Sequence, residues 1–249
     1  MDAIILAGST NSAKLQEASG VAAEGMIEIH NKLMVQYVLE ALLASENINS
    51  VVVVGLPEVQ EYFRDWPEVV LAPAGSTPVK SLINGLKHSD SAGMVLVATD
   101  DIPLITTEAV DHFVGQCQDR KADLFYPIIN REVHEARYPG SERTYVKLKE
   151  GTFTGGNIFL INPNKVPQCA AKVEDFVRLR KKPFELCKLV GVTFLIKFLL
   201  RALSITEAES RVSSLLGING YAVISPYPEV GLDVDKLSDL EMVKNYMTG

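Results

Sequence analysis

Apolar runs suited to buried strands alternate along this chain with amphipathic stretches of helical length. Residues 51–54 and 94–98 show no polar alternation, which predicts strands that helices cover on both faces. This pattern is typical of a layered α/β fold. The expected strands are residues 2–7, 50–55, 69–72, 94–98, 124–128, 157–161 and 221–224. The expected helices are residues 33–44, 59–65, 78–88, 107–118, 192–202, 207–216 and 239–247.

Three of the expected helices carry start signals in the sequence. Ser238 and Glu241, at the start of the last helix, have the spacing of a capping box. Pro78 follows Thr77, which suits a first helical position behind a capping residue. Thr206 and Glu209 have the spacing of a capping box.

Residues 130–154 are charged and show no regular period, and residues 163–203 have helical character. We therefore expect one domain over residues 1–249, in which residues 130–203 form an insertion or helical sub-lobe. Open α/β sheets bind ligands at the carboxyl edge of their strands, so we expect this sub-lobe to cover the site and contact a second substrate.

Composition and charge restrict the class of protein. The chain has 249 residues, of which 47% are hydrophobic, and this is enough to bury a substantial core. Its net charge of −7 argues against extended nucleic-acid binding, which needs a basic surface. A small anionic substrate remains possible, because a metal ion can reverse the local field.

We expect a cytoplasmic protein without a membrane partner. The three cysteines (Cys117, Cys169 and Cys187) are far apart and have neither zinc-site nor disulfide spacing. The first apolar stretch is short and lacks the basic start of a secretory signal. Charged residues interrupt the most hydrophobic segment, residues 186–203. Its longest uncharged run is therefore well below the roughly 20 apolar residues that a bilayer span needs. We interpret this segment as a buried or lobe-packing helix.

The first strand ends in the sequence LAGS, residues 6–9. Gly8 has no Cβ to block the close approach of a base or phosphate, and free main-chain N–H groups at a strand end can hold a polyphosphate. An ordinary strand–helix turn would equally explain one glycine. Neither the dinucleotide-binding nor the Walker-type glycine pattern occurs in the chain.

Carboxylates follow a second buried strand and recur near the end of the chain. Asp100 and Asp101 come directly after residues 94–98, and GLDVDKLSDL, residues 231–240, contains Asp233, Asp235 and Asp239. A divalent ion is commonly held by one or two carboxylates together with substrate phosphates. The alternatives are solvated loop charges or helix caps. Asp239 falls in a first helical turn, where the helix dipole favours a carboxylate whatever the function.

Five segments in order resemble the MobA-like nucleotidyltransferase family: IILAG, MIEIHNKLMVQYVLEAL, ATDDIPLIT, GGNIFLINP and LDVDKLSDL. The resemblance implies a nucleotide-diphospho-sugar transferase (GT-A-like) fold. This fold is a Rossmann-like α/β/α arrangement with a mostly parallel sheet, which we expect to be mixed by one antiparallel strand. It also implies a Mg²⁺-dependent enzyme that transfers an NMP group from an NTP to a small anionic acceptor and releases pyrophosphate.

The resemblance assigns roles to particular residues. Asp101 and Asp235 would hold the metal, and Lys14 would contact the phosphates. Asp100 is expected to be a solvated or capping charge, and Asp233 is left undecided. The nucleotide would lie against two loops, formed by Leu6, Ala7, Gly8 and Ser9 and by Gly75, Ser76 and Ser81.

The acceptor is expected at Gly155, Gly156 and Asn157, where paired glycines permit close backbone approach. A bulge or turn would explain these glycines nearly as well. Lys147 and Lys149 could meet an anionic acceptor, although alternating charges on an exposed strand are commoner.

The chain departs from the family pattern in its phosphate contacts. Ser9 replaces a glycine, Ala13 falls near the expected arginine, and Glu24 or Gly25 falls near the expected lysine. Two other functions therefore stay open: a glycosyltransferase that uses a nucleotide-sugar, and a non-catalytic nucleotide-binding protein. A homodimer is possible.

Overall fold

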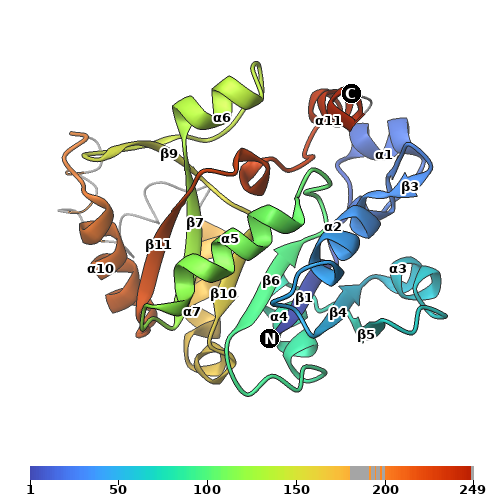
Figure 1. Cartoon of the computed structure of the whole chain (residues 1–249), viewed down its shortest axis with the longest axis horizontal. Helices are drawn as coiled ribbons and strands as arrows, with labels where there is room; N and C mark the ends of the chain where they lie inside the picture. Colours follow the sequence, from blue (N-terminus) through green and yellow to red (C-terminus); the bar gives the residue numbers. More distant parts are fainter. Residues whose placement is uncertain (180–190, 192–193, 195–196, 198–199, 248–249) are drawn as a thin grey trace.

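A mixed sheet forms the centre of the molecule, with helices on both of its faces (Figure 1). The computed structural model describes residues 1–179, 191, 194, 197 and 200–247. In this part of the chain the strand order is β5-β4-β1-β6-β10-β7-β9-β8, and β11 also pairs with β7. The strands are β1 (Asp2–Ala7), β4 (Ser50–Gly55), β5 (Val69–Pro73), β6 (Val95–Thr99), β7 (Leu124–Asn130), β8 (Val146–Leu148), β9 (Gly151–Gly155), β10 (Ile158–Ile161) and β11 (Gly220–Ser225).

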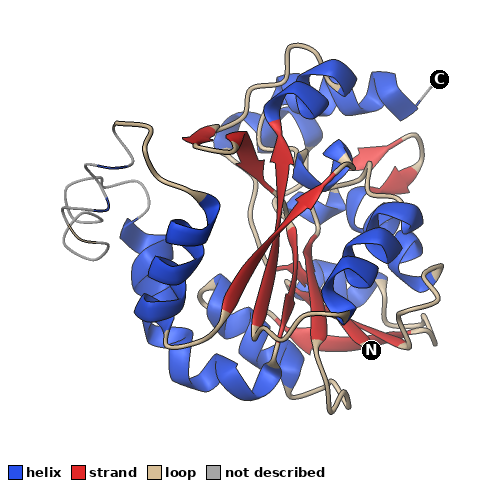
Figure 2. Cartoon of the chain, turned by 60° about the vertical axis from the view of Figure 1, so that its left-hand side comes forward, coloured by secondary structure: helices blue, strands red, loops and turns tan. Residues whose placement is uncertain are grey.

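The helices connect these strands and cover the sheet (Figure 2). They are α1 (Ala13–Ser19), α2 (Met34–Leu43), α3 (Pro57–Tyr62), α4 (Pro78–Leu86), α5 (Thr107–Gln118), α6 (Arg131–Arg137), α7 (Val166–Leu179), α10 (Ile205–Leu216) and α11 (Leu237–Met247). Short 3₁₀ turns are η1 (Glu24–Met26), η2 (Pro163–Lys165) and η3 (Pro228–Gly231), and a small hairpin joins β2 (Glu28–Ile29) to β3 (Lys32–Leu33). The predicted α/β layers are confirmed.

The two faces of the sheet bury alternate residues of the same strands. Ile5 and Val53 belong to the core under α2 and α5, whereas Ile4 and Val52 belong to the core under α4. All four side chains are fully buried. This explains why the central strands have no polar alternation, because both faces of a central parallel strand are covered.

More strands run against the parallel direction than the sequence predicted. β10 pairs antiparallel with both β6 and β7, and β9 also pairs antiparallel with β7. Residues 130–154 were expected to be irregular, but they contain α6, β8 and β9. These elements are short. β9 pairs with β7 and β8 pairs with β9, and this pairing supplies the stability that local propensity lacks in the two strands.

The helix α10 closes the edge of the sheet at β11 (Figure 1). Its capping box consists of Ser204 and Glu207, so the predicted start at Thr206 was wrong by two residues. Glu209 instead accepts a hydrogen bond from the Ala222 main-chain N–H at 2.8 Å, and Ser213 accepts one from Gly220 at 2.9 Å. Side chains thus satisfy edge-strand donors that could otherwise pair with another strand.

A third apolar cluster joins the region from α1 to η1 with the C-terminal segment. It contains Leu15 of α1, Ile27 after η1, Leu232 and Val234 before α11, and Leu240 within α11. Figure 1 shows α11 next to α1 at the same end of the molecule. The acidic segment before α11 is therefore packed against the region that follows β1.

Several residues of the apolar segment 186–203 lie outside the described part of the chain, so its interpretation as a helix stays a prediction. Among the described residues, no helix combines the length and apolar character that crossing a bilayer demands. β9 and β10 lie within residues 130–203 and belong to the central sheet, and the placement of this segment over the site also stays a prediction.

The observed start of α10 gives a test with a matched control. Ser204→Ala removes the side chain that accepts from the Glu207 N–H and should lower the free energy of unfolding by about 1 kcal/mol. Thr206→Ala, inside the first turn, should change it by less than about 0.5 kcal/mol. Urea unfolding monitored by circular dichroism measures both, and a larger loss for Thr206→Ala would contradict the observed cap.

Candidate functional site

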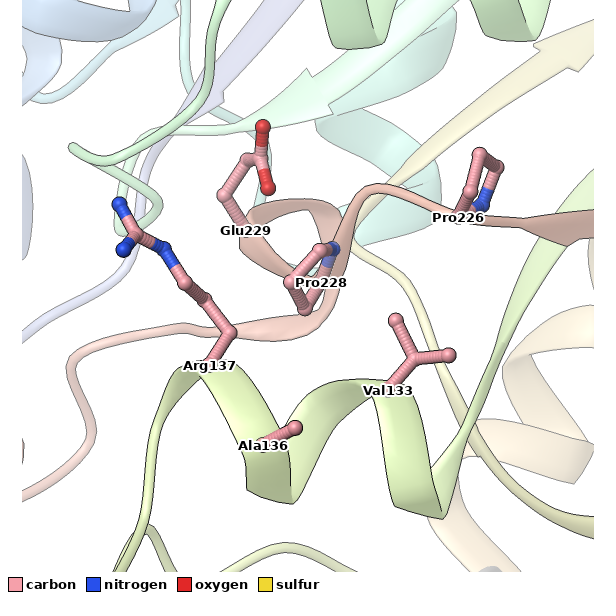
Figure 3. Close-up of a pocket in the computed structure, with 6 residues that line it drawn as sticks. All are labelled: Val133, Ala136, Arg137, Pro226, Pro228 and Glu229. Carbon is pink, nitrogen blue, oxygen red and sulfur yellow. The ribbon is translucent and has the colours of Figure 1, made fainter.

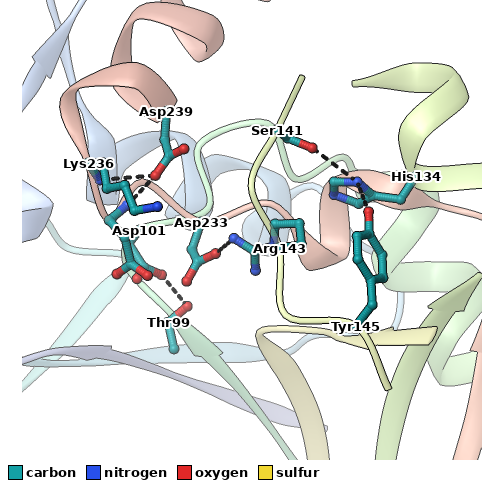
Figure 4. A network of polar contacts seen from close by, with 10 residues as sticks. Thr99, Asp101, His134, Ser141, Arg143, Tyr145, Asp233, Lys236 and Asp239 are labelled. Atoms are coloured by element: carbon teal, nitrogen blue, oxygen red, sulfur yellow. Dashed lines mark hydrogen bonds and ion pairs between the residues drawn. The ribbon is translucent and has the colours of Figure 1, made fainter. Parts of the chain in front are cut away.

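Asp101 lies just beyond the carboxyl end of β6, near the middle of the sheet. The Thr99 hydroxyl donates a hydrogen bond to Asp101 Oδ1 at 2.5 Å, which orients the carboxylate (Figure 4). The main-chain oxygen of Asp101 accepts from the Val234 N–H at 2.9 Å. This second bond fixes the C-terminal segment against the end of β6.

The segment Leu232–Asp235 alternates between the core and the site. Leu232 and Val234 are buried in the third apolar cluster, with 1% and 0% of their surface exposed. Asp233 and Asp235 alternate with them and carry their carboxylates to Asp101. Ligand oxygens of Asp101, Asp233 and Asp235 all lie within 4.8 Å of one another. Three carboxylates at this separation suit a hard divalent ion such as Mg²⁺.

Glu24, in η1, places a further carboxyl group near this cluster. Its main-chain N–H donates to Ser9 O at 3.2 Å, so the loop after β1 lies beside it. Burial raises the pKa of Glu24 to about 7, and the charges of Asp235 and Asp233 add to the rise, whereas a hydrogen bond from Ser9 opposes it. A carboxyl group therefore stands near the position where the family pattern suggested a lysine.

The electrostatics of Asp101 and Asp100 reflect the same crowding. Burial and the charge of Asp233 raise the pKa of Asp101 to about 7, while its hydrogen bond from Thr99 lowers it. Asp100 is only 1% exposed, and burial raises its pKa, so the expectation of a solvated charge was wrong. A Cβ on Gly25 would come 2.5 Å from Asp100 Oδ2, which shows how closely the η1 backbone covers this carboxyl group.

The two predicted nucleotide loops meet at the carboxyl ends of β1 and β5. A Cβ on Gly8, next to Leu6 and Ala7 at the end of β1, would lie 2.9 Å from Ala74 Cβ. The absence of that side chain therefore allows the loops to touch. The buried Ser81 hydroxyl accepts from the Gly75 N–H at 2.9 Å.

The exposed residues of the two nucleotide loops, Ser9 and Ser76, lie at the surface of the site edge. The Ser76 hydroxyl accepts a hydrogen bond from Lys80 Nζ at 3.1 Å. Asn11, which the sequence analysis did not single out, fixes the first loop by donating to Val21 O at 2.9 Å. This bond ties the loop after β1 to the connection that follows α1.

The structure places the remaining predicted residues less centrally. Lys14 is exposed in the first turn of α1, and no ion pair of the described residues joins it to the acidic cluster. Gly155 lies against the Tyr126 ring, and Gly156 lies against Val230. The Asn157 main chain donates to Val230 O at 2.9 Å and accepts from Thr99 N at 3.1 Å. These contacts give the Gly155–Asn157 strand entry a packing role, and acceptor binding there stays a prediction.

Arg143, in the connection between α6 and β8, is a site residue that the sequence analysis missed. Its Nη1 forms an ion pair with Asp233 Oδ1, and the two side chains are only 12% and 15% exposed. Its neighbour Glu142 pairs with Lys236 at 2.5 Å, so the 141–143 segment contacts the 233–236 segment twice. Arg143 lies in an aperiodic charged segment, so only its positive charge could have drawn attention to it.

His134 supports the segment that carries Arg143 (Figure 4). Its ring is fully buried, and Nδ1 lies 3.3 Å from both the Ser141 hydroxyl and the Tyr145 hydroxyl. Burial and the charge of Arg143 lower the pKa of His134 to about 4, so the ring is neutral at physiological pH. A neutral histidine adds packing and hydrogen bonds there without adding charge.

A separate pocket of about 410 Å³ lies between α6 and η3 (Figure 3). Glu229 is engaged by the Thr106 hydroxyl at 3.0 Å. Apart from Arg137 and Glu229, the residues that line the pocket are apolar. Its lining residues are Val133, Ala136, Arg137, Pro226, Pro228 and Glu229.

Comparisons with known proteins agree with the resemblance seen in the sequence. A family model described as the MobA-like NTP transferase domain matches residues 3–172. A structure described as a hypothetical transferase from Thermus thermophilus is 39% identical, with a TM-score of 0.83, and the match covers 96% of this chain and 98% of that one. Among curated protein sequences, none matches this chain.

More distant structures share the fold. CMP:2-keto-3-deoxy-manno-octonic acid synthetase complexed with CTP has a TM-score of 0.64 at 14% identity, with 99% of this chain and 98% of that chain covered. A nucleotidyl transferase from Methanothermobacter has a TM-score of 0.60 at 13% identity, with 99% and 97% covered. The mixed, mostly parallel sheet is thus the sheet of nucleotidyltransferases.

The crowding of carboxyl groups predicts how stability depends on pH and Mg²⁺. Because the folded-state pKa values of Asp101 and Glu24 are raised to about 7, the metal-free fold binds extra protons and loses stability as pH rises from about 4 to about 7. Mg²⁺ must displace these protons. Mg²⁺ should therefore raise the unfolding temperature more at pH 8 than at pH 5.5. Thermal scans with and without about 5–10 mM Mg²⁺ would measure the difference.

Asp101→Asn separates stability from metal binding. Without Mg²⁺ at pH 8 it should stabilise the fold by about 1–2 kcal/mol, because it removes one of the crowded charges. It should also abolish most of the Mg²⁺ response. Asp65→Asn, at an exposed position after α3, is the control and should change neither quantity. A full Mg²⁺ response in Asp101→Asn would show that the ion binds elsewhere.

Proposed function

Because this chain belongs to the MobA-like NTP transferase family, we propose that it transfers a nucleoside monophosphate from an NTP to a small anionic acceptor and releases pyrophosphate. The observation that supports this most is the meeting of Asp101, Asp233 and Asp235 within 4.8 Å. These carboxylates come from distant parts of the chain and lie beside the loop after β1. A structural neighbour is known in complex with CTP, which supports an NTP as the substrate class.

The first loop would hold the phosphates through main-chain N–H groups, with Gly8 permitting close approach. The second loop, Gly75 to Ser81, would border the base and ribose. Asp101 and Asp235 would hold Mg²⁺, which when bound neutralises phosphate oxygens and stabilises the charge that develops on the leaving pyrophosphate. Lys14 is the nearest cation in sequence to the first loop and would contact the pyrophosphate.

Thr99 and the C-terminal segment would act before any substrate binds. The Thr99 hydroxyl fixes Asp101 Oδ1, and the Val234 N–H fixes the Asp101 main chain. A carboxylate held in this way loses little freedom when it binds an ion, which favours a correctly oriented phosphate.

A nucleotide-sugar-dependent glycosyltransferase is the second candidate, and Glu24 is the observation that favours it. A carboxyl group stands where the family pattern suggested a phosphate-binding lysine. A nucleoside diphosphate-sugar brings less negative charge than a triphosphate, so it would be repelled less by this carboxyl group.

Pyrophosphate release tests the proposal. The chain is incubated with Mg²⁺, each of the four common NTPs and a panel of phosphorylated and carboxylated small molecules, and pyrophosphate is detected by a coupled assay. Asp101→Ala should reduce the turnover by at least about 100-fold, because the metal would lose a ligand that also positions the phosphate. Asp65→Ala should retain full turnover.

Two outcomes would count against this function. Pyrophosphate release by Asp101→Ala equal to that of the unmodified chain would remove Asp101 from the reaction. Tight Mg²⁺-dependent binding of nucleotide-sugars, with no pyrophosphate released from any NTP, would favour the glycosyltransferase.

A further inference from the structure

Arg143 has more hydrogen-bonding capacity than the structure uses. A guanidinium group carries five N–H donors, and Arg143 donates through Nη1 to Asp233. Its buried Nε has no partner among the described residues. The side chain as a whole is 12% exposed, so this charged group is largely removed from water. Unused donors on a desolvated cation favour an incoming anion.

Arg143 lies across the acidic cluster from the predicted nucleotide loops. Those loops follow β1 and β5, Asp101 follows β6, and Arg143 precedes β8 at the other end of the strand order. In phosphoryl-type transfer, the attacking and leaving oxygens lie roughly in line on opposite sides of the phosphorus. With pyrophosphate on the side of the first loop, the attacking group comes from the side of Arg143.

The charge of the site favours such a cation beside an anionic nucleophile. Glu24, Asp101 and Asp235 influence one another's ionisation, and all would repel an approaching anion. Lys236 is adjacent in sequence, but its ammonium group pairs with Glu142. Arg143 already forms an ion pair with Asp233 of the acidic cluster. It can therefore hold an acceptor anion close to the metal-binding carboxylates.

The segment around Arg143 is fixed in advance. The Tyr138 N–H donates to His134 O at 2.8 Å, and the Ser141 hydroxyl donates to Tyr138 O at 2.9 Å. Tyr138 also packs edge-on against Tyr246 of α11. An arginine held by such contacts gives up little conformational entropy when it binds, which strengthens recognition.

We propose that Arg143 binds the anionic group of the acceptor, a phosphate or a carboxylate, and directs the acceptor toward the α-phosphorus. This role rests on the proposed nucleotidyl transfer and names the residue that selects the second substrate. The planar guanidinium matches both oxyanions, whereas a lysine at this position would offer a point charge without the paired geometry.

Calorimetric titrations of three variants test this role. Mg²⁺ with a non-hydrolysable α,β-methylene NTP is titrated first into the unmodified chain, Arg143→Gln, Arg143→Lys and the exposed control Arg64→Gln. Inorganic phosphate and acetate are then titrated into each loaded protein and into each protein with Mg²⁺ alone. Thermal unfolding confirms that every variant is folded.

Arg143→Gln should keep nucleotide affinity within about threefold, because Asp101 and Asp235 are unchanged, and should weaken the binding of phosphate or acetate by about 10- to 100-fold. The anion affinity of Arg143→Lys should fall between those of the unmodified chain and Arg143→Gln. Arg64→Gln should bind nucleotide and anion as the unmodified chain does. The anion that binds more tightly identifies the acceptor group as a phosphate or a carboxylate.

The outcomes separate this role from the proposed function. No nucleotide binding by the unmodified chain would overturn the proposed function. Normal nucleotide binding with anion affinity unchanged in Arg143→Gln, or with no anion binding in the unmodified chain, would overturn the role of Arg143 alone. An equal loss of nucleotide and anion affinity in Arg143→Gln would show that the arginine only orients Asp233, and would also overturn it.

Discussion

The burial of Leu232 and Val234 in the third apolar cluster, with Leu15 of α1 and Ile27 after η1, is the contact on which the candidate site depends. These two side chains join the core formed by both ends of the chain, and the alternation of the segment then directs Asp233 and Asp235 toward Asp101. Burying side chains of this size contributes about 1.5–3 kcal/mol each. That gain offsets the repulsion between carboxylates that would otherwise separate.

The price of this arrangement is a site whose carboxyl groups hold protons at unusually high pH. Asp101 and Glu24 have pKa values near 7, and buried Asp100 is raised as well. A divalent ion would relieve this crowding, so metal affinity and metal-free stability oppose each other here. Functional sites commonly retain such local destabilisation, because the groups that bind a ligand are poorly satisfied without it.

The sequence predicted the regular part of the fold and missed the irregular part. Uninterrupted apolar runs predicted the bounds of β1, β4 and β6 to within about one residue, because strands buried on both faces leave a strong local signal. The short strands β8 and β9 left no such signal, since β9 depends on pairing with β7 and β8 depends on pairing with β9. Asp100 was misjudged for a similar reason: its burial is caused by the distant η1 backbone around Gly25.

By itself, the sequence determined the α/β layers, the family and the acidic segments after β6 and before α11, since each depends on residue order and local pattern. Only the tertiary structure decided that Asp233 joins Asp101 and Asp235, that Glu24 borders them and that Arg143 is their counter-charge. Electrostatic contacts between residues as far apart as 101 and 235 depend on distance in space. The number of residues between two positions does not determine their distance in space, which is fixed only when the core packs.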